Sequence, residues 1–157
     1  MPRRVLTITS PTNAHALAAY AGITVLGALH TLIGPGPALS AFLTESIAAT
    51  LMGILVLGGV TCFSAAVMGA RERDPTMALT VEIGTLSILS VTLLLFLISL
   101  VDYYGVDAPT TTVMVSMFLG GSVARLLQAG HERKLLQFAK QQLDRRAEAI
   151  TARPNRE

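Results

Sequence analysis

The sequence predicts an all-α membrane protein with four transmembrane helices and a C-terminal amphipathic helix. Of its 157 residues, 52% are apolar and only 14% are charged, and the mean hydropathy is +0.58. A soluble domain usually carries about 25% charged residues. Four apolar tracts each approach the roughly 20 residues that a helix needs to cross the hydrocarbon core of a bilayer.

Segments rich in proline, glycine and charge separate these tracts. They read GPGP at 34–37, RERDP at 71–75 and DYYGVDAP at 102–109. Because proline cannot continue a helix without losing a hydrogen bond, each segment marks the end of a span. The predicted organisation is an N-terminal segment (1–13), a four-helix bundle (14–128, with spans at 14–33, 47–70, 77–101 and 110–128) and a basic tail (129–157).

Lysine and arginine predict which side of the membrane each segment faces. Basic residues occupy the N-terminal segment, the middle connection and the tail, beginning with Arg3, Arg4, Arg71 and Arg73. The other two connections contain no lysine or arginine, but hold Glu45, Asp102 and Asp107. Since basic segments stay in the cytoplasm, we expect both termini and the middle connection to be cytoplasmic.

A cleavable signal peptide is the alternative interpretation of the first span. The letters MPRR precede the apolar tract, and ALSA at 38–41 resembles a cleavage site. The tract is about 20 residues long, which exceeds a usual signal-peptide core. We therefore expect the first span to be retained.

Glu82 is the single charge in the third apolar tract. It lies five residues into that span, about 7–8 Å from the cytoplasmic boundary, and Arg125 lies at a similar depth in the fourth span. An unpaired charge within the membrane costs about 2.5–3.5 kcal/mol. The sequence therefore predicts an intramembrane ion pair between Glu82 and Arg125, with His15 at the same level and Arg71 or Arg73 as competing partners. The pair could fix helix register, handle a proton or ion, or assist oligomer assembly.

Small and hydroxyl-bearing residues recur on one face of three spans. The third span has Glu82, Thr85, Thr92 and Ser99; the second has Ser46, Thr50, Gly53, Thr61 and Ser64; the fourth has a packing ladder of Ser116, Gly120 and Ala124. Such faces let helices in membranes approach closely. These faces would either pack against each other within one bundle, or line a lumen or a contact that is shared between copies.

Sites for chemistry are not recognisable in the sequence. It lacks phosphate-binding and dinucleotide-binding glycine motifs, HExxH and CxxC, so we expect neither an enzyme nor a cofactor. His30, Glu45 and Asp102 are predicted near the outer boundary, but without the short spacing of a metal site. The lone Cys62 excludes a disulfide framework, and no basic patch interleaved with aromatic residues suggests nucleic acid.

The tail has the pattern of an amphipathic helix, either continuous with the fourth span or broken at Gly130 and ended by Pro154. Its apolar residues recur every three or four positions, at Leu136, Ala139, Leu143, Ala147 and Ile150. Its basic residues are candidates for contact with anionic lipid: Arg133, Lys134, Lys140, Arg145 and Arg146. The tail could lie on the inner leaflet or form a short coiled coil with another copy.

The chain resembles the small four-span membrane proteins of actinobacterial phages and prophages, some of which are holin-like. The resemblance lies in HTLIGPGPALSAF, in VEIGTLSILSV and in the basic tail. It implies a self-associating protein of the bacterial inner membrane that permeabilises that membrane during host lysis. The alternatives are a non-lytic scaffold, accessory or exclusion protein, which would satisfy its polar faces within one copy, and a small ion or solute transporter.

Overall fold

The structure, a computed structural model, describes residues 14–34, 36–69, 76–105 and 110–151, and all of its regular elements there are α-helices. In chain order these helices are α1 (Ala14–Ile33), α2 (Pro37–Phe42), α3 (Glu45–Gly69), α4 (Thr76–Tyr104) and α5 (Thr110–Thr151). The predicted N-terminal segment and the arginines at 71 and 73 lie outside the described residues.

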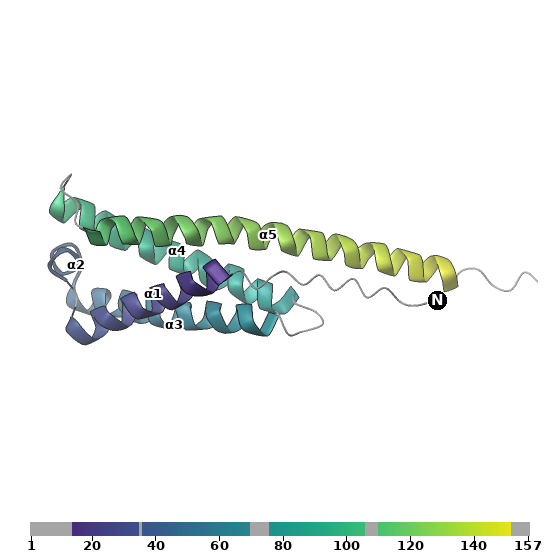
Figure 1. Ribbon diagram of the computed structural model, residues 1–157, viewed down its shortest axis with the longest axis horizontal. Helices are drawn as coiled ribbons and strands as arrows, with labels where there is room; N and C mark the ends of the chain where they lie inside the picture. Colours follow the sequence, from purple (N-terminus) through teal and green to yellow (C-terminus); the bar gives the residue numbers. More distant parts are fainter. Residues whose placement is uncertain (1–13, 35, 70–75, 106–109, 152–157) are drawn as a thin grey trace, which may run out of the picture.

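The four long helices lie side by side, and α2 sits at one end of them (Figure 1). α1 packs on α3, α3 on α4 and α4 on α5, while α1 meets α5 over a much smaller area. α1 begins, α3 ends and α4 begins at the same end of the bundle. We call it the basic end, because the chain segments that adjoin it in sequence carry the lysines and arginines.

Each long helix is long and apolar enough to cross a membrane. Their outward faces carry large apolar side chains, with Leu57 70% and Met117 72% exposed. A water-soluble bundle would bury such residues, whereas hydrocarbon chains cover them at no cost. The chain is therefore an all-α membrane protein, as its composition predicts.

The predicted limits of the spans differ from the helices by a few residues. α4 runs three residues past the predicted end, to Tyr104, and Gly105 then takes a φ of 65° while its N–H donates to the Val101 carbonyl. Gly34 ends α1 in the same way, with a φ of 97°. Glycine adopts this left-handed conformation without steric cost, so both helices end there.

The connection after α1 contains a helix that the sequence does not predict. The proline-rich stretch reads as a simple turn, yet Pro37 begins α2, where its missing N–H removes no hydrogen bond. Ala38 and Leu39 are buried, and α2 packs mainly against α4. This short helix covers the end of the bundle opposite the basic end.

Two glycines allow α1 and α3 to approach closely. A Cβ on Gly59 would meet the Thr24 hydroxyl and would lie 3.0 Å from the Tyr20 carbonyl oxygen of α1. A Cβ on Gly27 would lie 2.9 Å from the Val56 backbone nitrogen of α3. Because backbone atoms cannot move aside, glycine sets the spacing between these helices.

α5 continues unbroken through Gly130. Of the two predicted alternatives, the tail is therefore continuous with the fourth span and is not broken at Gly130. Figure 1 shows its C-terminal part, in yellow, running well beyond the other helices. We call residues 131–151 the arm. Pro154, predicted to end the helix, lies outside the described residues.

Candidate functional site

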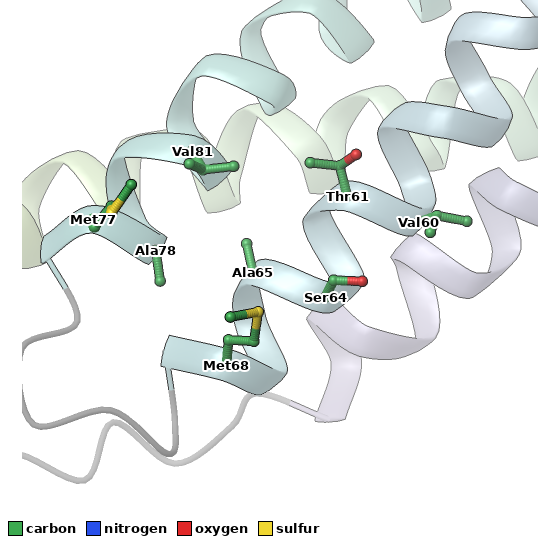
Figure 2. Close-up of a pocket in the computed structure, with 8 residues that line it drawn as sticks. All are labelled: Val60, Thr61, Ser64, Ala65, Met68, Met77, Ala78 and Val81. Atoms are coloured by element: carbon green, nitrogen blue, oxygen red, sulfur yellow. The ribbon is translucent and has the colours of Figure 1, made fainter.

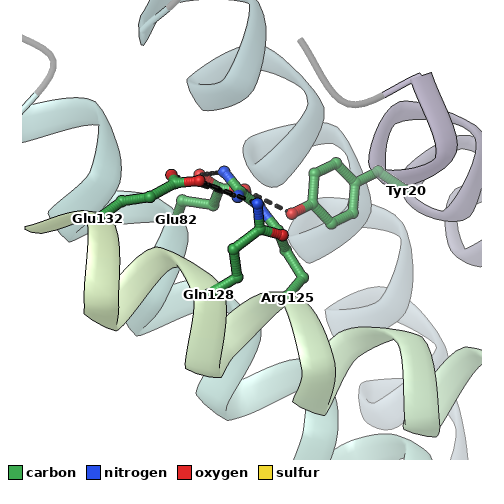
Figure 3. Close-up of polar contacts among 5 residues, drawn as sticks. All are labelled: Tyr20, Glu82, Arg125, Gln128 and Glu132. Carbon is green, nitrogen blue, oxygen red and sulfur yellow. Dashed lines mark hydrogen bonds and ion pairs between the residues drawn. The ribbon is translucent and has the colours of Figure 1, made fainter. Parts of the chain in front are cut away.

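A network of charged side chains lies inside the bundle near the basic end (Figure 3). At its centre, Arg125 of α5 donates from Nε to Glu82 Oε1 at 2.9 Å and from Nη2 to Glu82 Oε2 at 3.0 Å. The Arg125 and Glu82 side chains are 13% and 3% exposed. The structure thus brings together the two charges that the sequence places at one depth, and it joins them at two points.

Tyr20 of α1 completes the shell around the buried carboxylate. Its hydroxyl donates to Glu82 Oε1 at 2.5 Å, and the residue is 1% exposed. Both oxygens of Glu82 therefore accept hydrogen bonds, and the carboxylate links α1, α4 and α5. Sequence reasoning missed Tyr20, although it lies six residues into its span, the depth at which Glu82 lies in α4.

Arg125 also binds a second carboxylate, at the start of the arm. Its Nη1 donates to Glu132 Oε1 and Oε2 at 3.2 and 3.3 Å, and Gln128 Nε2 donates to Glu132 Oε1 at 3.0 Å. The Glu132 side chain is 23% exposed. One guanidinium therefore bridges the bundle interior and the arm.

This network holds helices together through hydrogen bonds and ion pairs. A charge-assisted, two-point contact is among the strongest side-chain interactions and fixes the geometry of both partners. Among the described residues, no three His, Cys, Asp or Glu side chains gather closely enough to hold a metal ion. Cys62 is buried in α3 as a free thiol.

His15 occupies a different place from the one predicted. It lies exposed in the first turn of α1, five residues before Tyr20. A step of five residues is about 7.5 Å along the helix axis and a rotation of about 140°. Tyr20, not His15, is the α1 side chain that contacts Glu82.

The polar faces of the second and third spans do not face each other. On α4, Thr92 and Ser99 are buried and donate to the carbonyls of Ile88 and Phe96, and Thr85 is half-buried. On α3, Gly53 is half-buried, whereas four hydroxyl-bearing residues are exposed: Ser46, Thr50, Thr61 and Ser64. One face therefore lies inside a single copy and the other on its surface.

The small-residue ladder of α5 also lies on the surface. Ser116, Gly120 and Ala124 are exposed, and a Cβ on Gly120 would have no neighbour within 4 Å. The residues that α5 buries against the bundle include Val115 and Ala129. Within one copy, the ladder therefore packs against no other helix.

A groove of about 330 Å³ lies between α3 and α4 near the basic end (Figure 2). It is lined mostly by apolar side chains: Val60, Thr61, Ser64, Ala65, Met68, Met77, Ala78 and Val81. Met77 is 77% exposed, so this groove belongs to the outward face of the bundle.

The three polar residues predicted near the outer boundary, His30, Glu45 and Asp102, have different surroundings. The His30 ring meets Phe96 edge-on, with ring centres 5.3 Å apart, and its Nδ1 lies 3.0 Å from the Leu26 carbonyl. Glu45 and Asp102 are exposed at the ends of their helices. The His30 ring therefore packs against the bundle, whereas the Glu45 and Asp102 carboxylates are exposed.

The basic residues of the tail lie along the arm. Of Arg133, Lys134, Lys140, Arg145 and Arg146, all but the half-buried Arg133 are exposed. The arm also exposes Leu135, Phe138 and Leu143, by 54%, 61% and 66%. It therefore presents both charge and apolar surface.

Comparison with protein-family models, with curated proteins and with solved structures finds no match to this chain. What the protein does is therefore inferred from its own residues.

Proposed function

We propose that this protein is a non-enzymatic membrane scaffold or accessory protein, which holds a helical arm at the cytoplasmic face of a bacterial inner membrane. The observation that carries this proposal is the double role of Arg125. It closes the bundle through Glu82 and fastens the first turn of the arm through Glu132. The direction of the arm is thus coupled to the packing of the spans.

The distribution of charge supports the cytoplasmic location of the arm. Arginines and lysines of the chain flank the basic end, and the connections at the other end carry none. Basic segments next to spans remain on the cytoplasmic side. Reporter fusions at both termini should report the cytoplasm, and a fusion reporting the opposite side would contradict this orientation.

The buried network argues against a pore or a transport pathway through one copy. Glu82 is 2% exposed; its Oε1 accepts hydrogen bonds from Tyr20 and Arg125, and its Oε2 accepts one from Arg125. A transport or proton-relay carboxylate in a membrane usually faces a water-filled cavity. Here the protein itself satisfies the charge.

Inducible expression in a bacterium tests the scaffold proposal. The protein should accumulate in the inner membrane while membrane potential and viability stay unchanged, with or without a matched lysin. Collapse of the potential at a defined time after induction would reject a scaffold in favour of a lytic protein.

A holin-like function is the second candidate, and the outward polar face of α3 favours it. Thr61 and Ser64 are exposed and Thr50 donates to its own helix, so neighbouring copies could meet along this face. In that case a lesion would be lined by α3. Replacing Thr61→Val and Ser64→Ala together would then delay or abolish lysis, whereas a scaffold would be unaffected.

A further inference from the structure

α5 passes through a glycine at the point where the span becomes the arm. Gly130 is helical and its φ is not positive, so its backbone conformation does not require glycine. A Cβ added there would meet nothing within 4 Å, so packing within one copy does not require glycine either. Glycine is the poorest helix former after proline. The backbone of α5 therefore bends most easily at this residue.

Gly130 also lies at the surface of the membrane. Arg125 contacts Glu82, which lies six residues after the start of α4, so a point six residues beyond Arg125 is about level with that start. α4 has 29 residues and is about 43 Å long, which is close to the thickness of a bilayer with its headgroups. A bend at Gly130 would therefore lay the arm on the headgroups.

The contacts of Glu132 cross this glycine (Figure 3). Arg125 Nη1 donates to both Glu132 carboxylate oxygens at 3.2 and 3.3 Å, and Gln128 Nε2 donates to Oε1 at 3.0 Å. Arg125 is itself held at two points by the buried Glu82. We call the contacts of Glu132 with Arg125 and Gln128 the latch. They join the first turn of the arm to the last turns of the span while α5 is straight.

The side of the arm that is turned away from the bundle carries both basic and apolar side chains. Eighteen residues make about five full turns of helix, so residues that far apart lie in line. Four exposed arm residues lie in this way below exposed residues of the span: Lys134 below Ser116, Leu135 below Met117, Phe138 below Gly120 and Arg145 below Leu127. We call these four arm residues the outward arm face. Its Leu135 and Phe138 are 54% and 61% exposed.

The chemistry of the outward arm face fits an anionic membrane surface. Lys134 and Arg145 lie within about 40° of Phe138 round the helix. The acidic residues of the described part of the arm lie about 80° or more away from Phe138: Glu132, Asp144 and Glu148. Helices with this pattern lie in the headgroup layer, with apolar side chains inserted and basic side chains beside lipid phosphates. In the straight arm, Phe138 stands about 12 Å beyond Gly130 and away from the lipid.

We propose that the latch is an autoinhibitory contact, which holds the outward arm face away from an anionic membrane surface. Opening the latch lets α5 bend at Gly130 toward the lipid, and the outward arm face then binds the headgroups. This bend separates Arg125 from Glu132, because both lie about 120–140° round the helix from Phe138. The latched state and the lipid-bound state therefore exclude each other. This inference rests on the proposed scaffold function, since it adds a control on the arm that the scaffold holds.

Fluorescence of a single tryptophan tests the proposal. The chain contains no tryptophan, so Phe138→Trp in the full-length protein reports on the outward arm face alone. The protein is placed in nanodiscs of phosphatidylglycerol with brominated acyl chains, which quench tryptophan on contact. We expect weak quenching while the latch is closed, and quenching about threefold stronger or more after Glu132→Ala. An unchanged signal after Glu132→Ala would overturn the proposal.

Three matched variants separate the latch from charge and from general loosening of the arm. Asp144→Ala removes an arm carboxylate that takes no part in the latch, and should leave the quenching unchanged. Gly130→Ala added to Glu132→Ala removes the hinge, and should return the quenching to the latched value. Leu143→Trp, used as the reporter in place of Phe138→Trp, lies about 140° round the helix and should show no rise after Glu132→Ala. A rise in any of the three would overturn the proposal.

Nanodiscs of phosphatidylcholine with the same brominated chains test the chemistry of the surface. The Glu132→Ala protein should be quenched about threefold less there than in phosphatidylglycerol, because the basic side chains lose their anionic partners. Equal quenching in the two lipids would overturn the proposal. Failure of the scaffold function is a separate result, since it appears as loss of membrane potential in cells and leaves the quenching unaltered.

Discussion

Glu82 on α4 and Arg125 on α5 form a two-point ion pair inside the bundle, with contacts of 2.9 and 3.0 Å. Taking two charges out of water is costly, and only good geometry with further hydrogen bonds offsets the cost. Tyr20 supplies such a bond to the carboxylate, and Glu132 accepts from the remaining terminal nitrogen of the guanidinium. The pair therefore specifies how three spans and the arm fit together.

Removing one member of the pair should be much worse than removing both. Arg125→Leu leaves Glu82 buried with Tyr20 as its remaining donor, and we expect a loss of about 3–5 kcal/mol in the free energy of unfolding. Glu82→Leu should cost a similar amount. The double variant should be more stable than either single variant, measured by denaturant titration in detergent. Losses that simply add would contradict the coupling.

Tyr20→Phe tests the hydrogen bond from α1. The change removes a donor to a charged acceptor while keeping the ring, so the free energy of unfolding should fall by about 1.5–3 kcal/mol. Tyr103→Phe is the control, because that ring is exposed near the other end of α4. Thermal unfolding of both variants in detergent checks the difference. Equal melting temperatures would mean that the Tyr20 hydroxyl contributes nothing.

Gly59→Ala should loosen the contact between α1 and α3. The added methyl group would meet the Tyr20 carbonyl and the Thr24 hydroxyl, so the helices must separate and the protein should lose about 1–3 kcal/mol of stability. Gly120→Ala is the matched control: its methyl group meets nothing, and alanine should stabilise the helix by about 0.5–1 kcal/mol. Melting temperatures shifted in the same direction would argue against the close contact.

Ser122→Ala should be neutral or stabilising. The Ser122 hydroxyl is buried without a hydrogen-bond partner among the described residues, and an unmade hydrogen bond costs about 1–3 kcal/mol. Ser99 provides the comparison, since its hydroxyl donates to the Phe96 carbonyl at 2.7 Å. Ser99→Ala should cost about 0.6 kcal/mol, typical of hydrogen bonds in membranes. Denaturant titration of both variants measures the contrast, and a destabilised Ser122→Ala would refute it.

Much of the architecture follows from composition and depth. Each apolar tract forms a long helix, and counting residues from the ends of the spans suffices to match Glu82 with Arg125 across 43 positions. The same count would have led to Tyr20. A tyrosine near the end of a span fits an interfacial anchor equally well, so depth alone does not identify Tyr20 as a donor to Glu82.

Orientation about the helix axis was not predictable from a single sequence. Hydroxyls in a membrane can donate to their own helix, as Thr50 and Thr92 do, so they fit either an inward or an outward face. The spacing of the hydroxyl-bearing residues therefore did not show that α4 buries its polar face and that α3 exposes its polar face. The short α2 helix was missed because glycine and proline usually indicate a turn. This helix is held in place mainly by its packing on α4, which a single sequence does not show.

The distance along α5 tests the central claim, that the arm is a rigid continuation of the fourth span. Spin labels at Met117→Cys and Gln142→Cys, in a Cys62→Ala background, lie on one face of the helix 25 residues apart. Pulsed electron paramagnetic resonance in nanodiscs should give one narrow distribution of distances between the labels, centred at ~38 Å. A helix bent at Gly130 so that the tail lay flat on the membrane would give ~27 Å, and that result would contradict the account.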